Sequence, residues 1–223
     1  MATEPEILLA GEYFLGIQGL AIARSSTSRP SSIRARVDEV KTIVARFDEF
    51  PQSLELPVVK YEVEEGYAEW APSYDGANPA IEREEPVMHT LLTDLPKGDA
   101  LDAACGTGRH ADTLTKLGHR VIGVDTTEAM LAIARDKVPG AEFRRGRLEA
   151  IPMDDASVDL VTCALALEHV PDLAPVFREF ARVLRPGGHV LISDLHPVTK
   201  MTGGVAAFNR VNDTTRGVHF VSG

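Results

Sequence analysis

A chain of 223 residues can hold one large domain or a domain with an extension, and its composition is that of a globular protein. A formal net charge of −10 argues against nucleic acid as the partner, because phosphate backbones are bound by basic surfaces. The two cysteines, Cys105 and Cys163, form no disulfide framework and no CxxC pair, which favours a reducing compartment and therefore the cytoplasm.

Residues 1–63 are predicted to form a helical extension. The apolar run 6–24 starts with glutamate where a signal peptide has basic residues, and Glu12 and three glycines interrupt it. It therefore predicts a packing helix, with a role in a subunit contact, and no membrane span. A Ser-rich linker at 25–32 precedes a second helix, in which apolar residues recur at helical spacing from residue 33 to 47.

The remaining residues, 64–223, are predicted to form one domain with three parts. Residues 64–92, which carry several aromatic side chains and then a helical pattern, are interpreted as a lid. Residues 93–195 form the core of the domain, and residues 196–223 form a partial C-terminal segment.

Strands and helices alternate strictly in the core. Strands are expected at 99–105, 120–125, 141–146, 158–167 and 189–195, and helices at 109–118, 126–137 and 172–188, the last one ended by Pro186, Gly187 and Gly188. This alternation implies parallel strands joined by right-handed crossovers. The predicted fold class is α/β, a Rossmann-like, doubly wound and mostly parallel sheet with helices on both faces.

Glycines and acids gather at the carboxyl ends of the first two core strands, where such sheets bind ligands. Gly106 and Gly108 follow the first strand, and Asp125 ends the second. Residues 106–111 read GTGRHA and formally match the GxGxxA dinucleotide fingerprint, so an NAD-type oxidoreductase is one interpretation. No GK[ST] sequence follows, which argues against a P-loop.

Asp102 argues against a dinucleotide. A carboxylate beside the glycine turn would repel a pyrophosphate by about 4 kcal/mol per charge pair at 4 Å with an effective dielectric of 20. A nucleoside with a positively charged end and no phosphate fits better, and S-adenosylmethionine is such a ligand. Its amino group can meet Asp102, and its ribose hydroxyls can meet Asp125.

Five motifs then occur in order along the chain: LDAACGTG at 101–108, VIGVD at 121–125, EAML at 128–131, LEHV at 167–170 and RVLRPGG at 182–188. With them, the chain resembles the class I S-adenosylmethionine-dependent methyltransferases of the type 11 kind, which act on small molecules. The resemblance runs from about residue 66 to 197. One motif alone is weak evidence, but the ordered set is specific.

The resemblance implies S-adenosylmethionine as the cofactor, a small-molecule acceptor and no metal. The cofactor-binding positions that it implies are Tyr67, Tyr74, Asp102, Ala103, Gly106, Gly108, Asp125, Thr126, Met130, Arg147, Leu148, Ala164 and Leu165. His169, which follows the fourth core strand, is the candidate catalytic base.

One position departs from the family. Residues 146–148 read GRL where the family often has Gly-Asp-x, with the aspartate on the adenine amino group. Because arginine has no acceptor for that group, adenine recognition falls to the Leu148 backbone or to Glu149.

Each assignment has a structural alternative. Asp102 can cap the turn after its strand, and Asp125 can simply form a turn. A histidine at the start of a βα loop, such as His169, is more often a hydrogen-bonded structural residue than a base. Tyr67 and Tyr74 can belong to the core of a helix.

Methyl transfer is an in-line displacement at a carbon that the sulfonium has already activated, so the protein mainly has to position the acceptor and exclude water. A base is needed only for a nucleophile that keeps its proton, and no catalytic triad is required. Two other functions stay open: an NAD-type oxidoreductase, and an S-adenosylmethionine-binding protein that does not methylate.

The C-terminal segment is shorter than the resemblance leads us to expect. The 28 residues after Leu195 contain one strand-like run, 217–222, and are too few for a helix and two further strands. We therefore expect an incomplete sheet, in a chain that is truncated or whose missing cover comes from another protomer. Its exposed edge invites pairing and hence self-association into a homo-oligomer.

Overall fold

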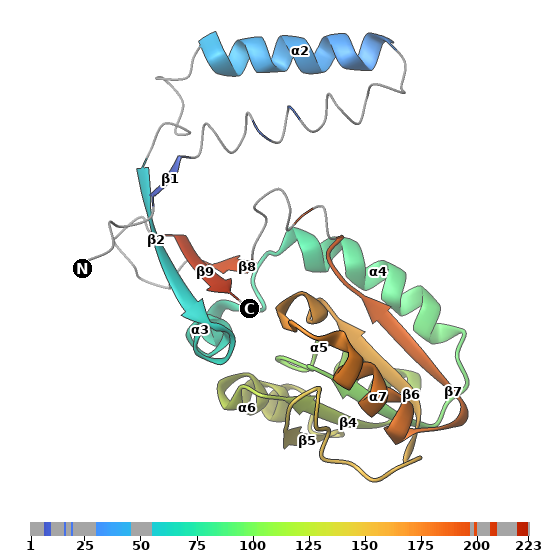
Figure 1. Cartoon of the computed structure of the whole chain (residues 1–223). Coiled ribbons are helices and arrows are strands. Elements are labelled where there is room, and N and C mark those ends of the chain that lie inside the picture. Colours follow the sequence, from blue (N-terminus) through green and yellow to red (C-terminus); the bar gives the residue numbers. More distant parts are fainter. Residues whose placement is uncertain are drawn as a thin grey trace. The chain divides into compact units, whose positions relative to one another are not determined.

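The computed structural model describes residues 7–9, 16, 19, 30–45, 55–196, 199, 206–208 and 218–222 (Figure 1). The chain divides into two compact units. One unit is drawn from Met1–Lys60 and Pro197–Phe220, and the other from Tyr61–His196 and Val221–Gly223.

The sequence predicts a helical extension over residues 1–63, but the structure contains strands as well as a helix there. Helix α2 (Pro30–Ala45) is present, but β1 (Ile7–Leu9) and β2 (Glu55–Glu62) are strands and pair in antiparallel fashion. The apolar run 6–24 thus contains a strand near its start, and most of the expected helix lies outside the described residues.

The C-terminal segment contains two short strands, β8 (Ala206–Phe208) and β9 (Val218–Ser222). Together with β1 and β2 they form a four-stranded sheet in the order β1-β2-β9-β8. β9 lies in the strand-like run at 217–222 that the sequence indicated, whereas β8 was not expected.

The second unit is built on a five-stranded parallel sheet, in the order β5-β4-β3-β6-β7. Its strands are β3 (Asp99–Ala103), β4 (Arg120–Asp125), β5 (Glu142–Arg145), β6 (Val158–Ala164) and β7 (Leu184–Ser193). Helices α5 (Arg109–Leu117), α6 (Glu128–Lys137) and α7 (Leu173–Val183) connect them, and α3 (Val63–Trp70), the short helix η3 (Ala71–Ser73) and α4 (Pro79–Thr93) precede them. The predicted α/β Rossmann-like sheet is confirmed.

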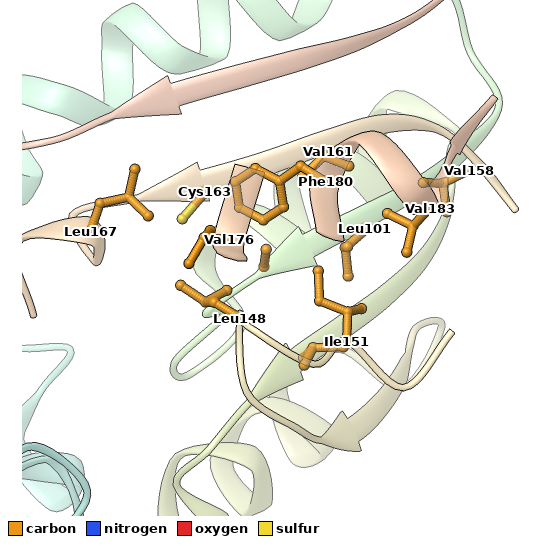
Figure 2. Close-up of a cluster of buried hydrophobic side chains, with 12 residues drawn as sticks. Leu101, Leu148, Ile151, Val158, Val161, Cys163, Leu167, Val176, Phe180 and Val183 are labelled. Carbon is orange, nitrogen blue, oxygen red and sulfur yellow. The ribbon is translucent and has the colours of Figure 1, made fainter. Parts of the chain in front are cut away.

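Alternate residues of the central strands serve the two faces of the sheet, as the period of two in a strand requires. On one face, Leu101, Val161 and Cys163 pack against Phe180 and Val176 of α7 (Figure 2). On the other face, the buried cluster joins α4 and α5 to β3, β4 and β6; its members are Leu92, Ala100, Ala111, Leu114, Val121 and Leu160. Burial on both faces explains the near-continuous apolar composition of β6.

Helix α7 differs from its prediction in two ways. It begins as expected, with Asp172 accepting a hydrogen bond from the Ala174 amide, but it ends at Val183, and the Pro-Gly-Gly sequence belongs to β7. Helical spacing predicts a buried stripe made of Leu173, Val176, Phe177, Phe180 and Leu184. In the structure Phe177 is 46% exposed, whereas Val183 is fully buried.

Strand β7 lies at one edge of the five-stranded sheet, and its Val190 is 43% exposed. Such an edge invites pairing, so self-association stays a prediction. No helix in the described part of the chain has the length and apolarity to cross a membrane.

Candidate functional site

The second unit contains a pocket where β3, β4 and β6 end. Its wall comes from α3, from the turns after β3 and β4, and from the loops after β5 and β6. The lining residues are Val63, Glu64, Tyr67, Tyr74, Ala104, Gly106, Val124, Asp125, Thr126, Thr127, Met130, Gly146, Arg147, Leu148, Glu149, Ala164, Leu165, Ala166, His169, Val170 and Pro171. Parallel sheets of this kind bind ligands at this edge.

The turn after β3 is tightly coiled and uses three residues with positive φ. Ala104 has a φ of 56°, Gly106 of 52° and Gly108 of 82°. Gly106 lines the pocket, and a Cβ there would meet only the ring of Tyr74, at 3.9 Å. Gly108 instead allows α6 to approach, because a Cβ there would lie 3.2 Å from the Cβ of Ala134. Gly106 therefore keeps the pocket open, whereas Gly108 allows close packing of α6.

Asp125, the last residue of β4, is fixed in the pocket wall by backbone amides. Its Oδ2 accepts a hydrogen bond from the Gly106 amide at 2.9 Å, and its Oδ1 accepts one from the Thr127 amide at 2.8 Å. Burial raises the pKa of this carboxyl above its usual range, and the amide hydrogen bonds work in the opposite direction. The Thr127 hydroxyl and the Thr126 amide also contribute to lowering this pKa, so several donors hold a carboxylate that lines the pocket.

Asp102 does not line the pocket, contrary to the sequence expectation. Its side chain is only 2% exposed, and its Oδ1 accepts a hydrogen bond from the Thr162 hydroxyl at 3.0 Å. Its Oδ2 makes no hydrogen bond with any described residue, and burial raises its pKa. Ala103 and Gly108, also predicted to bind the cofactor, are likewise absent from the wall.

A buried carboxylate that the sequence analysis missed lies close to the end of β3. Glu84 of α4 accepts hydrogen bonds from Arg109 at 2.6 Å and from the Ser193 hydroxyl at 2.7 Å. It also pairs with Nε2 of His110, at 3.0 Å. Burial alone would raise its pKa, but its interactions with His110, Ser193 and Arg109 outweigh burial and lower it to about 2. Sequence spacing gave no signal for this cluster, because its members come from three distant elements.

Three aromatic rings of the lid (residues 64–92) stack next to the pocket. Tyr67 lies 5.7 Å from Trp70, nearly parallel to it, and Tyr74 meets Trp70 edge-on at 5.0 Å. Tyr67 and Tyr74 both line the pocket, as predicted. Burial raises the pKa of Tyr67 well above 10 and that of Tyr74 to about 12, so both hydroxyls are protonated at neutral pH.

The lid is tied to the rest of its unit by polar contacts. Asp75 accepts hydrogen bonds from the Thr107 hydroxyl at 2.7 Å and from Lys137. Glu64, near the start of α3, pairs with Arg145 of β5. These contacts hold parts of residues 64–92 against the turn after β3, α6 and β5.

His169 stands at the end of the short helix η4 (Leu167–His169), in the pocket wall. Its Nε2 lies 2.8 Å from the Tyr67 hydroxyl and 3.8 Å from Oε1 of Glu168. The structure thus brings together the candidate base and one of the predicted lid tyrosines.

The other predicted cofactor residues lie in the wall. Thr126 and Met130 come from the β4–α6 region, Arg147 and Leu148 from the loop after β5, and Ala164 and Leu165 from the end of β6. Leu165 has a φ of 52°, a second non-glycine residue in the left-handed region beside Ala104. The Arg147 side chain is 71% exposed and lies 3.4 Å from Glu149.

The described residues contain no group of three or more His, Cys, Asp or Glu side chains that could hold a metal ion. The pocket wall combines a carboxylate held by backbone amides, two aromatic rings and a histidine.

Residues 101–192 match the family model described as a methyltransferase domain. A protein of Mycolicibacterium smegmatis, described as a probable S-adenosylmethionine-dependent methyltransferase, is 40% identical over 121 residues, which are 54% of this chain and 47% of that protein. A malonyl-[acyl-carrier protein] O-methyltransferase of Yersinia pestis is 37% identical over 141 residues, 63% of this chain and 52% of that protein.

Among solved structures, an S-adenosylmethionine-dependent methyltransferase from Mesorhizobium loti is 34% identical, with a TM-score of 0.47 over 51% of this chain and 55% of that one. The chain spans about half the length of the two relatives that it matches by sequence.

Proposed function

Because the domain over residues 101–192 belongs to the class I S-adenosylmethionine-dependent methyltransferase family, we propose that this chain binds S-adenosylmethionine in the pocket and transfers its methyl group to a small-molecule acceptor. The observation that carries the proposal is Asp125, a carboxylate fixed in the pocket wall at the end of β4. Two neighbouring hydroxyls on a ribose are donors of the kind that such a carboxylate accepts.

The residues in the wall fit this ligand. Gly106 leaves open space where a side chain would stand, so the methionine part can pass close to the backbone. Apolar side chains, Val63, Met130 and Leu148, form a surface suited to the flat face of adenine. Asp125 and Glu149 make the wall acidic, which suits a ligand with a positively charged sulfur.

The remaining predicted positions are assigned roles by where they lie. We assign Thr126 to the ribose and adenine side, and Ala164 and Leu165 to the sulfonium side at the end of β6. Tyr67 and Tyr74 cover the pocket. Asp102 is not assigned to the ligand, because its side chain is buried outside the wall.

The reaction asks little of the protein beyond geometry. Bound S-adenosylmethionine supplies a methyl group that its sulfonium sulfur activates. The side chains of the pocket orient the acceptor, and the aromatic cover of Tyr67 and Tyr74 excludes water; together, orientation and exclusion contribute several kcal/mol to lowering the barrier.

Calorimetric titration tests the proposal. S-adenosylhomocysteine and S-adenosylmethionine should bind, and NAD should not. Binding of NAD with no response to S-adenosylhomocysteine would support the oxidoreductase alternative and exclude this proposal. If S-adenosylmethionine binds but no methyl acceptor is found in a broad panel, the chain is a non-methylating binder.

A further inference from the structure

Two groups that can exchange a proton face each other in the pocket wall. The hydroxyl of Tyr67 lies 2.8 Å from Nε2 of His169, and both residues line the pocket. Glu168 places Oε1 3.8 Å from the same nitrogen, and the side chains of His169 and Glu168 are only 9% and 7% exposed. A buried hydroxyl, imidazole and carboxylate thus form a compact group, which positioning of the acceptor and exclusion of water do not require.

The charges around this group are unfavourable for an anionic acceptor. Besides Glu168, the carboxylates of Asp125 and Asp194 lie close enough to Tyr67 to contribute to raising its pKa. The one arginine in the described wall, Arg147, is 71% exposed and lies beside Glu149. A carboxylate or phosphate acceptor next to His169 would face the negative charges of these carboxylates. Arg109, whose charge acts on Tyr74 of the wall, is already paired with Glu84.

The surfaces beside this group favour a flat apolar acceptor. The rings of Tyr67 and Tyr74 lie 6.0 Å apart and tilted by 60°, and Val170 and Pro171 follow His169 in the wall. Aromatic rings prefer to pack against such tilted ring edges and faces.

Resting on the proposed function, we propose that the acceptor is an uncharged phenol and that Tyr67 and His169 together remove its proton. In the step, the phenol oxygen forms a bond to the methyl carbon while the carbon–sulfur bond breaks and its electron pair stays on sulfur. The phenol proton passes to the Tyr67 oxygen as the Tyr67 proton passes to Nε2 of His169. Tyr67 ends neutral and His169 ends as imidazolium, so the positive charge lost by sulfur appears on the imidazole.

The chemistry of a relay selects this acceptor class. A tyrosine hydroxyl has an ordinary pKa of about 10, and it exchanges protons readily with a group of similar acidity, which describes a phenol and not an aliphatic alcohol. Because burial keeps Tyr67 protonated, it works as a relay, and His169 is the final acceptor of the proton. Glu168 is a positioning residue, whose charge stabilises the imidazolium.

A pair of probes of nearly equal shape tests the acceptor class. 4-Nitrophenol and 4-nitrobenzoate differ in the group offered to His169, and the phenolate of the first is visible by its colour. Each is titrated into the complex of the chain with S-adenosylhomocysteine. 4-Nitrophenol should bind at least about tenfold more tightly than 4-nitrobenzoate, which corresponds to about 1.4 kcal/mol. Equal or tighter binding of 4-nitrobenzoate, or no binding of 4-nitrophenol, would overturn the acceptor class.

Ionisation of the bound probe tests the relay. Burial and the neighbouring carboxylates raise the pKa of a bound phenol, as they raise that of Tyr67, and proton transfer to His169 opposes this shift. Relative to a chain without the relay, the wild type should therefore lower the apparent pKa of bound 4-nitrophenol by about one unit or more. Tyr67→Phe and His169→Gln should each abolish the lowering, and Glu168→Gln should reduce it. His89→Gln, an exposed histidine on α4, is the matched control and should leave it unchanged. Lowering that persists in Tyr67→Phe and His169→Gln would exclude the relay.

S-adenosylhomocysteine binding separates this inference from the function on which it rests. If the wild-type chain does not bind S-adenosylhomocysteine, the proposed function fails. If the wild-type chain binds it, each variant is studied at a concentration of S-adenosylhomocysteine that saturates that variant, so any difference in probe ionisation reports on Tyr67 and His169 themselves. Tyr67→Phe keeps the ring that stacks on Trp70, so it serves as the second variant if His169→Gln does not fold.

Discussion

The ends of β3 and β4 look alike in the sequence and differ in the structure. Each strand carries an aspartate near its end, and the two strands are parallel neighbours. Asp125 is the last residue of β4 and reaches the pocket, whereas Asp102 is one residue short of the end of β3 and pairs in register with Gly123 and Thr162. A side chain inside a strand must point to one face of the sheet, and Asp102 shares the face of Ala100, covered by α4 and α5.

This difference of one position separates two kinds of carboxylate. At the end of β4 the backbone amides of Gly106 and Thr127 hold a carboxylate that a ligand can reach. Beside β3 the carboxylates of Asp102 and Glu84 are both buried. Glu84, which comes from α4, is paired with Arg109 and His110. We therefore expect substitutions at the β3 side to change stability and substitutions at the β4 end to change binding.

The largest expected effect is on stability, at Glu84. Glu84→Gln removes the charge that pairs with Arg109 and His110 in a buried setting, and should lower the free energy of unfolding by on the order of 3 kcal/mol at pH 7. The pKa of Glu84 is lowered to about 2 in the folded chain, from an ordinary value of 4.5. The contribution of Glu84 to the free energy of unfolding is therefore fully present above pH 4.5 and is lost as the pH falls toward 2.

Urea denaturation of the wild type and Glu84→Gln at several pH values measures this effect. The difference between the two should shrink between about pH 5 and pH 2. Glu85→Gln, at the next and exposed position of α4, is the matched control and should change little. A difference that stays constant down to pH 2 would show that Glu84 is not held ionised by its partners.

The next effect is on binding, at the end of β4. Asp125→Ala should weaken S-adenosylhomocysteine binding by about 1.5–3 kcal/mol, the range for hydrogen bonds to a charged group. Calorimetry gives the dissociation constant, and circular dichroism checks the fold, because the amides of Gly106 and Thr127 lose their acceptor. Affinity unchanged in a folded Asp125→Ala variant would remove Asp125 from the site.

A smaller effect on stability is expected at Asp102, the buried aspartate of β3. Burial raises its pKa, so the carboxylate costs stability at neutral pH and that cost disappears once the pH falls low enough to protonate it. Asp102→Asn keeps an oxygen for the Thr162 hydroxyl and should be at least as stable as the wild type at pH 7. Its advantage in unfolding free energy should vanish toward acidic pH.

Binding gives the contrast with Asp125. Asp102→Asn should keep its affinity for S-adenosylhomocysteine within about threefold, because Asp102 lies outside the pocket wall. A loss as large as that of Asp125→Ala would restore the role that the sequence alone suggested for Asp102.

Sequence reasoning predicted the core well because its signals are local. The runs at 120–125 and 109–118 carry their own period, start and stop signals, and the structure places β4 and α5 there. It also singled out several residues that line the pocket, since carboxyl ends of parallel strands share one edge, and their roles toward a ligand stay predictions. It missed the Glu84 cluster, which joins α4, α5 and β7, because contacts between distant elements leave no spacing pattern.

The sequence places Ala104 inside the expected strand 99–105, whereas β3 ends at Ala103. Positive φ is usually signalled by glycine, and an alanine at 104 gives no such signal. The structure nevertheless holds Ala104 at a φ of 56°, directly after β3 and in the pocket wall.

The smallest expected effect is on the free energy of unfolding, and it tests whether the positive φ of Ala104 strains the backbone. Glycine adopts the left-handed region without the penalty of a Cβ, which amounts to roughly 1–2 kcal/mol, but it loses more conformational freedom on folding. Ala104→Gly should therefore raise the free energy of unfolding by about 0.5 kcal/mol. Ala103→Gly, one residue earlier, is the matched control: it lies buried in β3 without positive φ, and there glycine should destabilise by about 1 kcal/mol. Denaturant titration of both variants measures the two changes, and if Ala104→Gly destabilises as much as Ala103→Gly, the turn at the end of β3 stores no strain.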